Sequence, residues 1–184
     1  MTDEKKSHSL KDKGIFFISK SFDNELAKDV VTWIFESNFD EKRNYDHLTL
    51  IINSGGGSVD AGFAIIDAIK GSALPVHTLG IGMIASMGLM TFLAGAKGHR
   101  ALTPNTAIMS HQFWSINIGK QHELLAAQKE FDLLGNKITR HYKQTTGLNE
   151  RQIKEILLPA HDVWLSAAEA LDYGICDEIR IASS

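Results

Sequence analysis

Apolar and polar residues alternate in the first half of the chain in blocks with two different periods. Short, nearly continuous apolar runs indicate strands buried on both faces, and apolar residues spaced three or four apart indicate helices. The predicted strands are 15–19, 47–53, 76–81, 99–103 and 107–110. The predicted helices are about 23–37, 59–70 and 86–95. This alternation is typical of an α/β protein with a parallel sheet and right-handed crossovers.

The second half begins with a long helical pattern over 119–147. Its apolar positions are Leu124, Leu125, Phe131, Leu134, Ile138 and Tyr142. At about 1.5 Å per residue, such a helix approaches about 40 Å, longer than the globule it belongs to. We therefore expect it to protrude and to pack against another subunit. Two later helices are indicated by capping boxes, Asn149 with Gln152 and Ser166 with Glu169.

Length and composition indicate one globular domain. The 184 residues are 43% hydrophobic and 22% charged, which is ordinary for a protein with a sizeable core. Residues 1–14 mix both charge signs without an apolar run, so we expect a mobile tail there and a single domain over 15–184. The net charge of −3 offers no basic surface for nucleic acid. The single cysteine, Cys176, rules out an intrachain disulfide and suits the cytoplasm.

The uncharged stretch over 71–96 is long enough to cross a bilayer. Four glycines divide it, at positions 80, 82, 88 and 95. Its pattern also changes from that of a strand to that of a helix. A buried strand followed by a buried helix is therefore favoured, and we expect no contact with a membrane.

A triple glycine, Gly55-Gly56-Gly57, directly follows the second predicted strand. The glycines can form only a flexible turn, or their missing side chains can let the main chain approach a ligand. N–H groups at the start of the next helix favour partial negative charge on such a ligand. A nucleotide site is disfavoured, because GxGxxG and the Lys-Ser/Thr of a phosphate loop are absent.

Ser86 stands where the next predicted strand passes into a helix. By itself it is a candidate helix N-cap. At such a corner, however, the hydroxyl lies beside the free N–H of Met87, which can hold the oxyanion formed when a serine attacks a carbonyl. The GxSxG motif of the α/β-hydrolases is absent, because Ile84 stands at its first glycine.

A serine nucleophile needs a base and a carboxylate that orients the base. Of eight histidines, His111 ends a short apolar strand, where its side chain can reach a cleft. Asp162 precedes the apolar run 163–165 and is either a turn residue or the orienting acid, and neighbouring His161 is a rival base. Neither HExxH nor a close His/Cys cluster occurs, so we expect no metal and no cofactor.

These segments recur together in one known family. They are Asn53-Ser-Gly-Gly-Gly-Ser-Val59, Ile84-Ala-Ser-Met-Gly88, Gly95-Ala-Lys-Gly98, Pro104-Asn105, Met109-Ser-His-Gln112 and Leu165-Ser-Ala-Ala-Glu-Ala-Leu-Asp-Tyr-Gly174. From about Ile15 to Ile179 the chain resembles the proteolytic subunit of Clp protease (ClpP). The resemblance implies a crotonase-like α/β fold of repeated β-β-α units, with the long helix as a protruding handle.

The resemblance also implies an activity and a site. Ser86 corresponds to the nucleophile, His111 to the base and Asp162 to the orienting acid. The N–H groups of Gly57 and Met87 correspond to the oxyanion hole. The implied reaction is metal-free hydrolysis of unfolded polypeptides or short peptides through an acyl-enzyme. It takes place in a chamber of one or two heptameric rings, which an unfoldase ATPase feeds.

Some positions depart from the family's usual pattern. Ser110 and Phe113 flank His-Gln where an apolar residue and a proline are typical, and Gly55 replaces a proline. The segment after His-Gln, 113–119, is not rich in glycine, and Ala160-His161 replace a charged pair. The short stretch before the first strand weighs against contact with an ATPase.

Other functions stay open at this point. A catalytically silent ring subunit is one alternative, although all three triad residues are present. A crotonase-type acyl-CoA enzyme is another, because that fold also uses glycine N–H groups as an oxyanion hole. A membrane signal-peptide peptidase requires a serine–lysine dyad and an anchor, which makes it the weakest alternative.

Overall fold

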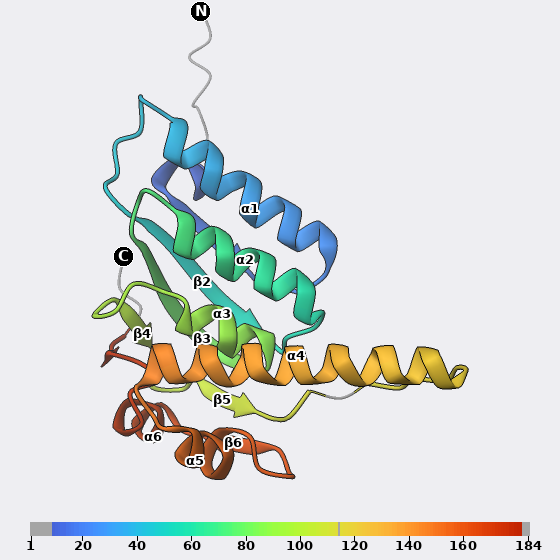
Figure 1. The fold of residues 1–184 in the computed structure, drawn as a ribbon. Helices are drawn as coiled ribbons and strands as arrows, with labels where there is room; N and C mark the ends of the chain where they lie inside the picture. Colours follow the sequence, from blue (N-terminus) through green and yellow to red (C-terminus); the bar gives the residue numbers. More distant parts are fainter. Residues whose placement is uncertain (1–8, 114, 182–184) are drawn as a thin grey trace, which may run out of the picture.

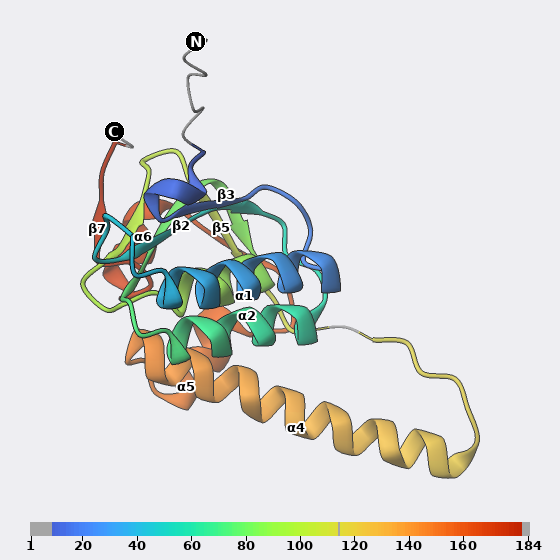
Figure 2. The ribbon, with the colours of Figure 1, turned by 90° about the horizontal axis from the view of Figure 1, so that it is seen from above.

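The computed structural model describes residues 9–113 and 115–181 as a sheet flanked by helices, with one long helix extending from the body (Figure 1, Figure 2). The strands are β1 (Ile15–Ile18), β2 (Leu48–Ser54), β3 (Val76–Ala85), β4 (Arg100–Leu102), β5 (Ala107–Ser110), β6 (Val163–Leu165) and β7 (Glu178–Ile179). The helices are α1 (Asn24–Phe39), α2 (Val59–Gly71), α3 (Met87–Leu93), α4 (Gln121–Thr146), α5 (Glu150–Gln152) and α6 (Ala167–Asp172). Two further turns are η1 (Lys11–Lys13) and η2 (Ile153–Leu157), the second of them a π-helix. The predicted order of strands and helices is confirmed.

The tail expected over 1–14 lies partly outside this description. Residues 1–8 are not among the described residues. Residues 11–13 form the single helical turn η1, which ends at Gly14 with a φ of +70°. The helices in 9–113 and 115–181 include none with the length and apolar character that a bilayer crossing requires.

The sheet is mostly parallel, in the order β1-β2-β3-β4-β7. β3 pairs first with β4 and then with β5, so β5 begins beyond the point where β4 ends. β6 pairs with β5 in the antiparallel direction, through Ser110↔Val163 and Met109↔Trp164. These pairings bring the ends of β3, β5 and β6 to one place in the molecule.

β3 is longer than the sequence predicts. The expected end near Ile81 is wrong, because the strand bends at Gly82, which has a φ of +63°, and continues to Ala85. The Asn53 side chain supports this bend, since its Oδ1 accepts the Met83 N–H at 3.2 Å. The extension carries the chain to Ser86, directly beyond the strand.

Helices α1 and α2 lie together over one face of the sheet (Figure 1). Their apolar stripes and the strands form the core, in which Ile18, Ile34, Leu50, Ile52, Ile65 and Ile84 are almost fully buried. Burying one such side chain contributes about 1.5–3 kcal/mol relative to its exposure. All seven residues of α3 are buried, so the helix that starts beside Ser86 is fixed on every side.

Helix α4 is continuous through Gly135 and protrudes from the body, as expected (Figure 2). Only its second half reaches the core, where Ile138, His141 and Tyr142 are buried. Its first half exposes 66% of Leu125, and Leu133 is 61% exposed. The helix thus carries apolar surface far from the core of its own chain.

Candidate active site

Ser86 lies at the corner between β3 and α3. Its φ of 53° and ψ of −120° make it the one non-glycine residue with a positive φ among residues 9–113 and 115–181. Such a conformation costs an L-residue of order 1–3 kcal/mol, and it occurs where surrounding structure enforces it. Ser86 does occupy the N-cap position of α3, yet its side chain makes no capping hydrogen bond. Its hydroxyl instead lies 2.9 Å from Nε2 of His111.

His111 follows β5 directly and comes to Ser86 through strand pairing. β5 runs parallel to β3, and the Ser86 N–H donates to the Met109 carbonyl at 3.0 Å. The two side chains therefore leave adjacent strands at the same edge, and 22% of the His111 side chain is exposed. A neutral imidazole with its proton on Nδ1 can accept the serine proton at Nε2.

Asp162 faces the other nitrogen of the base at a longer distance. Its Oδ1 lies 4.0 Å from Nδ1 of His111, and 62% of its side chain is exposed. The β5–β6 register accounts for the approach, because Ser110 pairs with Val163 in antiparallel strands, so that His111 after Ser110 lies beside Asp162 before Val163. This distance exceeds a hydrogen bond, as catalytic contacts often do without a bound substrate. His161, the rival base, is exposed, and the histidine within hydrogen-bond distance of Ser86 Oγ is His111.

The triple glycine approaches Ser86 through Gly56, which sequence reasoning missed. A Cβ at Gly56 would lie 2.7 Å from the Cβ of Ser86 and 3.0 Å from the nitrogen of Met87. Gly57 instead packs on the main chain of Phe22, where a Cβ would meet the backbone. The signal for Gly56 was the glycine run itself, which does not tell which glycine makes which contact.

Two N–H groups near Ser86 are open. Hydrogen bonds from Phe22 N–H to the Gly56 carbonyl and from Ser58 N–H to the Phe22 carbonyl, both 2.8 Å, hold the glycine turn. Within residues 9–113 and 115–181, the N–H groups of Gly57 and Met87 have no acceptor. Free backbone donors beside a serine hydroxyl are what an oxyanion hole requires.

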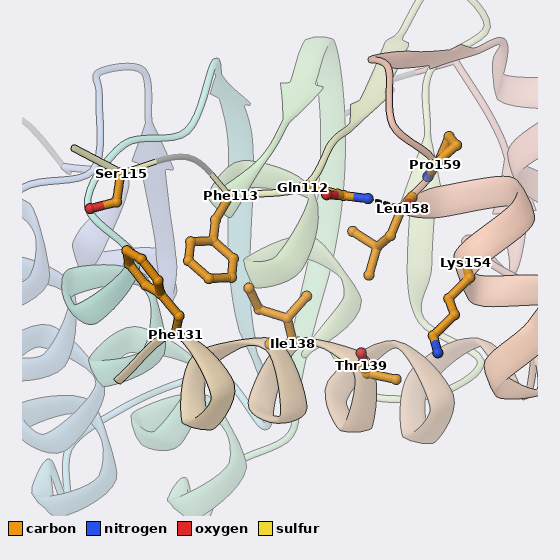
Figure 3. Close-up of a pocket in the computed structure, with 10 residues that line it drawn as sticks. Gln112, Phe113, Ser115, Phe131, Ile138, Thr139, Lys154, Leu158 and Pro159 are labelled. Atoms are coloured by element: carbon orange, nitrogen blue, oxygen red, sulfur yellow. Dashed lines mark hydrogen bonds between the residues drawn. The ribbon is translucent and has the colours of Figure 1, made fainter. Parts of the chain in front are cut away.

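A cavity of about 780 Å³ opens beside the base (Figure 3). Figure 3 shows Phe113 and Leu158 on one side of it and Ile138, from α4, on the other. The Phe113 and Phe131 rings lie 5.7 Å apart. Because Gln112 and Phe113 directly follow His111, the cavity can accept an apolar side chain of a molecule bound at Ser86.

The other buried or clustered histidines have structural contacts. His141 is buried under α3, where Nε2 donates to the Met90 carbonyl at 2.8 Å. Burial lowers the pKa of His141 to about 4. His47, His77 and His99 stack on one another with ring centroids 4.1 and 4.0 Å apart. Partial burial and these two neighbours lower the pKa of His77 to about 4.

Comparisons with known proteins show which family the chain belongs to. The family model described as Clp protease matches residues 2–182. The chain is 35% identical over 176 residues to ATP-dependent Clp protease proteolytic subunit 1 of Protochlamydia amoebophila (strain UWE25), covering 94% of this chain and 82% of that protein. A solved structure of a ClpP1 point mutant from Listeria monocytogenes matches with a TM-score of 0.81 and 35% identity, covering 93% of each chain. The ClpP-like α/β fold expected from the sequence is confirmed, and the chain belongs to the Clp protease family.

Proposed function

We propose that this chain is a serine peptidase in which Ser86 attacks a peptide carbonyl and His111 takes its proton. The observation that carries the proposal is the 2.9 Å contact between Ser86 Oγ and His111 Nε2. It occurs at a serine held with a positive φ, a costly backbone conformation that suits a functional corner. Membership in a family of proteolytic subunits supports the same reaction.

The reaction follows from the positions of these groups. As Ser86 Oγ attacks, its proton passes to Nε2 of His111, and the carbonyl oxygen becomes an oxyanion. The N–H groups of Met87 and Gly57 stabilise that oxyanion, and losing one such donor costs about 10²–10³-fold in rate. The imidazolium then protonates the leaving amine, and an acyl-enzyme remains on Ser86. Water, deprotonated by His111, releases the acyl group.

Asp162 acts on the charged form of the base. Its carboxylate favours the proton on Nδ1 and stabilises the imidazolium through charge. At 4.0 Å and largely exposed, it supplies less than a buried, hydrogen-bonded carboxylate does. A short movement of its loop toward His111 completes the triad when substrate binds.

The substrates we propose are unfolded polypeptides and short peptides. The apolar cavity beside His111 suits a substrate side chain, and the exposed leucines of α4 suit assembly into one or two heptameric rings around a chamber. The name of the relative from Protochlamydia, an ATP-dependent protease subunit, supports an ATPase as partner.

A fluorophosphonate probe tests the proposal. Intact mass of the labelled protein should rise by one probe per chain, and peptide mapping should find the adduct on Ser86. Ser86→Ala should abolish labelling, whereas Ser21→Ala, at an exposed serine, should label like the wild type. Labelling that survives Ser86→Ala contradicts the assignment of the nucleophile.

A silent ring subunit is the second candidate, favoured by the long His111–Asp162 distance. It predicts rings without cleavage of small fluorogenic peptides, whereas an active peptidase cleaves them. The crotonase-type alternative predicts turnover of a CoA thioester, and it gives no reason for a serine and a histidine in contact.

A further inference from the structure

The residue before His111 has a buried hydroxyl with two partners. Ser110 is fully buried, and its Oγ donates to the Leu157 carbonyl at 2.5 Å. The same Oγ lies 2.8 Å from the hydroxyl of Tyr142, which is 2% exposed. A serine hydroxyl has one proton, and the Leu157 carbonyl takes it. Tyr142 must therefore donate to Ser110, which forms a directed chain from α4 through β5 to η2.

The residue after His111 makes a parallel contact. Gln112 donates its Nε2 to the Leu158 carbonyl at 2.9 Å, as the dashed line in Figure 3 marks. Leu157 and Leu158 stand at the end of η2, where carbonyls lack partners within the helix. Both chain neighbours of the base thus satisfy consecutive carbonyls on one segment.

That segment leads directly to Asp162. The loop from Leu158 to Asp162 starts at the two carbonyls held by Ser110 and Gln112. It ends where Val163 pairs with Ser110 in the β5–β6 ladder. The carboxylate itself is largely exposed, and it faces Nδ1 of His111 at 4.0 Å. The position of Asp162 therefore depends on how firmly both ends of its loop are attached beside His111.

We propose that Ser110 and Tyr142 are positioning residues that keep the Asp162 carboxylate facing Nδ1 of His111. This inference rests on the proposed peptidase function. An apolar residue at position 110 could not bind the Leu157 carbonyl, so this attachment depends on the Ser110 hydroxyl. Without the Ser110 hydroxyl, the Leu157 carbonyl and the Tyr142 hydroxyl are left buried and unpaired. The start of the loop can then move away from β5.

The test measures the second-order rate constant for fluorophosphonate labelling of Ser86. Ser110→Ala should lower it about tenfold, because a displacement near 1 Å has effects of this order or larger. Tyr142→Phe should lower it less, since the Ser110–Leu157 bond survives. Thr78→Val is the matched control, because the Thr78 side chain is also buried and its hydroxyl also donates to a backbone carbonyl, that of Phe92 at 2.9 Å.

The decisive readout is the effect of Ser110→Ala on the labelling rate constant when Asp162 has already been replaced by alanine. If Ser110 acts through Asp162, Ser110→Ala there should change labelling by less than about twofold, because coupled residues are not additive. A purely structural role predicts that the tenfold loss persists in that background and appears in Thr78→Val. Either of these results, or wild-type labelling of Ser110→Ala, overturns the proposal.

A second readout separates this proposal from the proposed function. Wild-type protein that fails to label contradicts the peptidase assignment. In that case the imidazole ¹⁵N shifts of His111 still report on its tautomer, which depends on the group facing Nδ1. Ser110→Ala should shift the balance away from the Nδ1–H form, and unchanged shifts contradict the positioning role.

Discussion

At the scale of single residues, the strain at Ser86 is the clearest mark of function. The corner between β3 and α3 requires a positive φ, which glycine adopts at little cost and serine does not. The fold keeps a serine there, and its side chain bonds His111 rather than capping the helix. The unfavourable positive φ at Ser86 thus places a hydroxyl group beside His111.

This strain predicts that glycine at position 86 makes the protein more stable than alanine does, although neither residue can act as the nucleophile. Ser86→Gly and Ser86→Ala should both abolish labelling, but the glycine variant should be more stable than the alanine variant by about 1 kcal/mol. For a chain of this length that is a rise in Tm of about 2–4 °C. Differential scanning calorimetry of the two variants measures it, and equal Tm values contradict the presence of strain.

The glycine turn makes a second prediction at this scale. Gly56→Ala should destabilise the fold and abolish labelling, because its Cβ would lie 2.7 Å from the Cβ of Ser86. Gly55→Ala is the control, since its Cβ would meet only a Met83 methyl at 3.6 Å, and no positive φ is required there. Labelling rates and thermal melts of both variants check this, and equal tolerance of the two contradicts the close approach.

At the scale of elements, one buried ion pair joins the end of the sheet to α4. Arg100, 2% exposed, binds Asp177 with Nη2–Oδ1 at 2.6 Å and Nε–Oδ2 at 2.9 Å. It also donates to the Thr145 carbonyl at 2.8 Å. β4, the turn before β7 and the last turn of α4 therefore meet at a single guanidinium, which fixes the base of the protruding helix.

The pair predicts acid-dependent stability. Burial acts to raise the pKa of Asp177, but hydrogen bonds from the Arg100 side chain and from backbone N–H groups outweigh it and hold that pKa below its ordinary 3.8. A carboxyl whose pKa is lower in the folded than in the unfolded protein stabilises the fold at pH values above its unfolded pKa. This stabilisation is lost as the pH falls through the folded pKa. Asp177→Asn should thus cost about 3 kcal/mol at pH 7, and progressively less as the pH falls below 3.8 and through the lower pKa of the folded state.

Urea unfolding at pH 7 and at about pH 2, well below the ordinary pKa of a carboxyl, measures this difference. Asp172→Asn, at an exposed aspartate, serves as the control and should leave stability nearly unchanged at both values. A penalty for Asp177→Asn that is the same at both pH values contradicts a stabilising charge on Asp177.

The elements themselves were largely predictable from the sequence. Helix and strand order follows from apolar spacing, and both capping boxes form as the sequence indicates. The end of β3 could not be predicted from apolar spacing, because the bend of this strand depends on Asn53 of another strand. The contacts of Ser110 could not be predicted either, because its partners Tyr142 and Leu157 lie 32 and 47 residues away in the sequence. In the sequence, Ser110 was notable only because it replaces the family's usual apolar residue. Contacts between distant segments leave no local trace in apolar spacing.

At the scale of the whole molecule, α4 is the feature that the single chain does not explain. Its second half is anchored in the core, and its first half presents Leu124, Leu125 and Leu133 to solvent. Exposed apolar side chains along a protruding helix are typical of surfaces that other subunits cover. Helix α4 thus has one end anchored in the core near the proposed site and another end, with exposed leucines, far from that site.

Assembly should therefore depend on these leucines. Leu125→Ala with Leu133→Ala removes apolar surface while keeping high helix propensity, so the expected result is a shift toward smaller species in native mass spectrometry. Gln128→Ala removes a polar neighbour from the same helix and should leave the distribution unchanged. An unchanged distribution in the leucine variant contradicts a role for this surface in assembly.

The backbone at Ser86 also has an evolutionary consequence. In a gene copy whose product no longer cleaves peptides, selection for the hydroxyl ends, but the cost of the positive φ at that corner remains. Glycine removes that cost without disturbing α3 or β3, so drift at this position should favour it. The residue at this corner then distinguishes working subunits from those that have only a structural role, even where the rest of the sequence has hardly diverged.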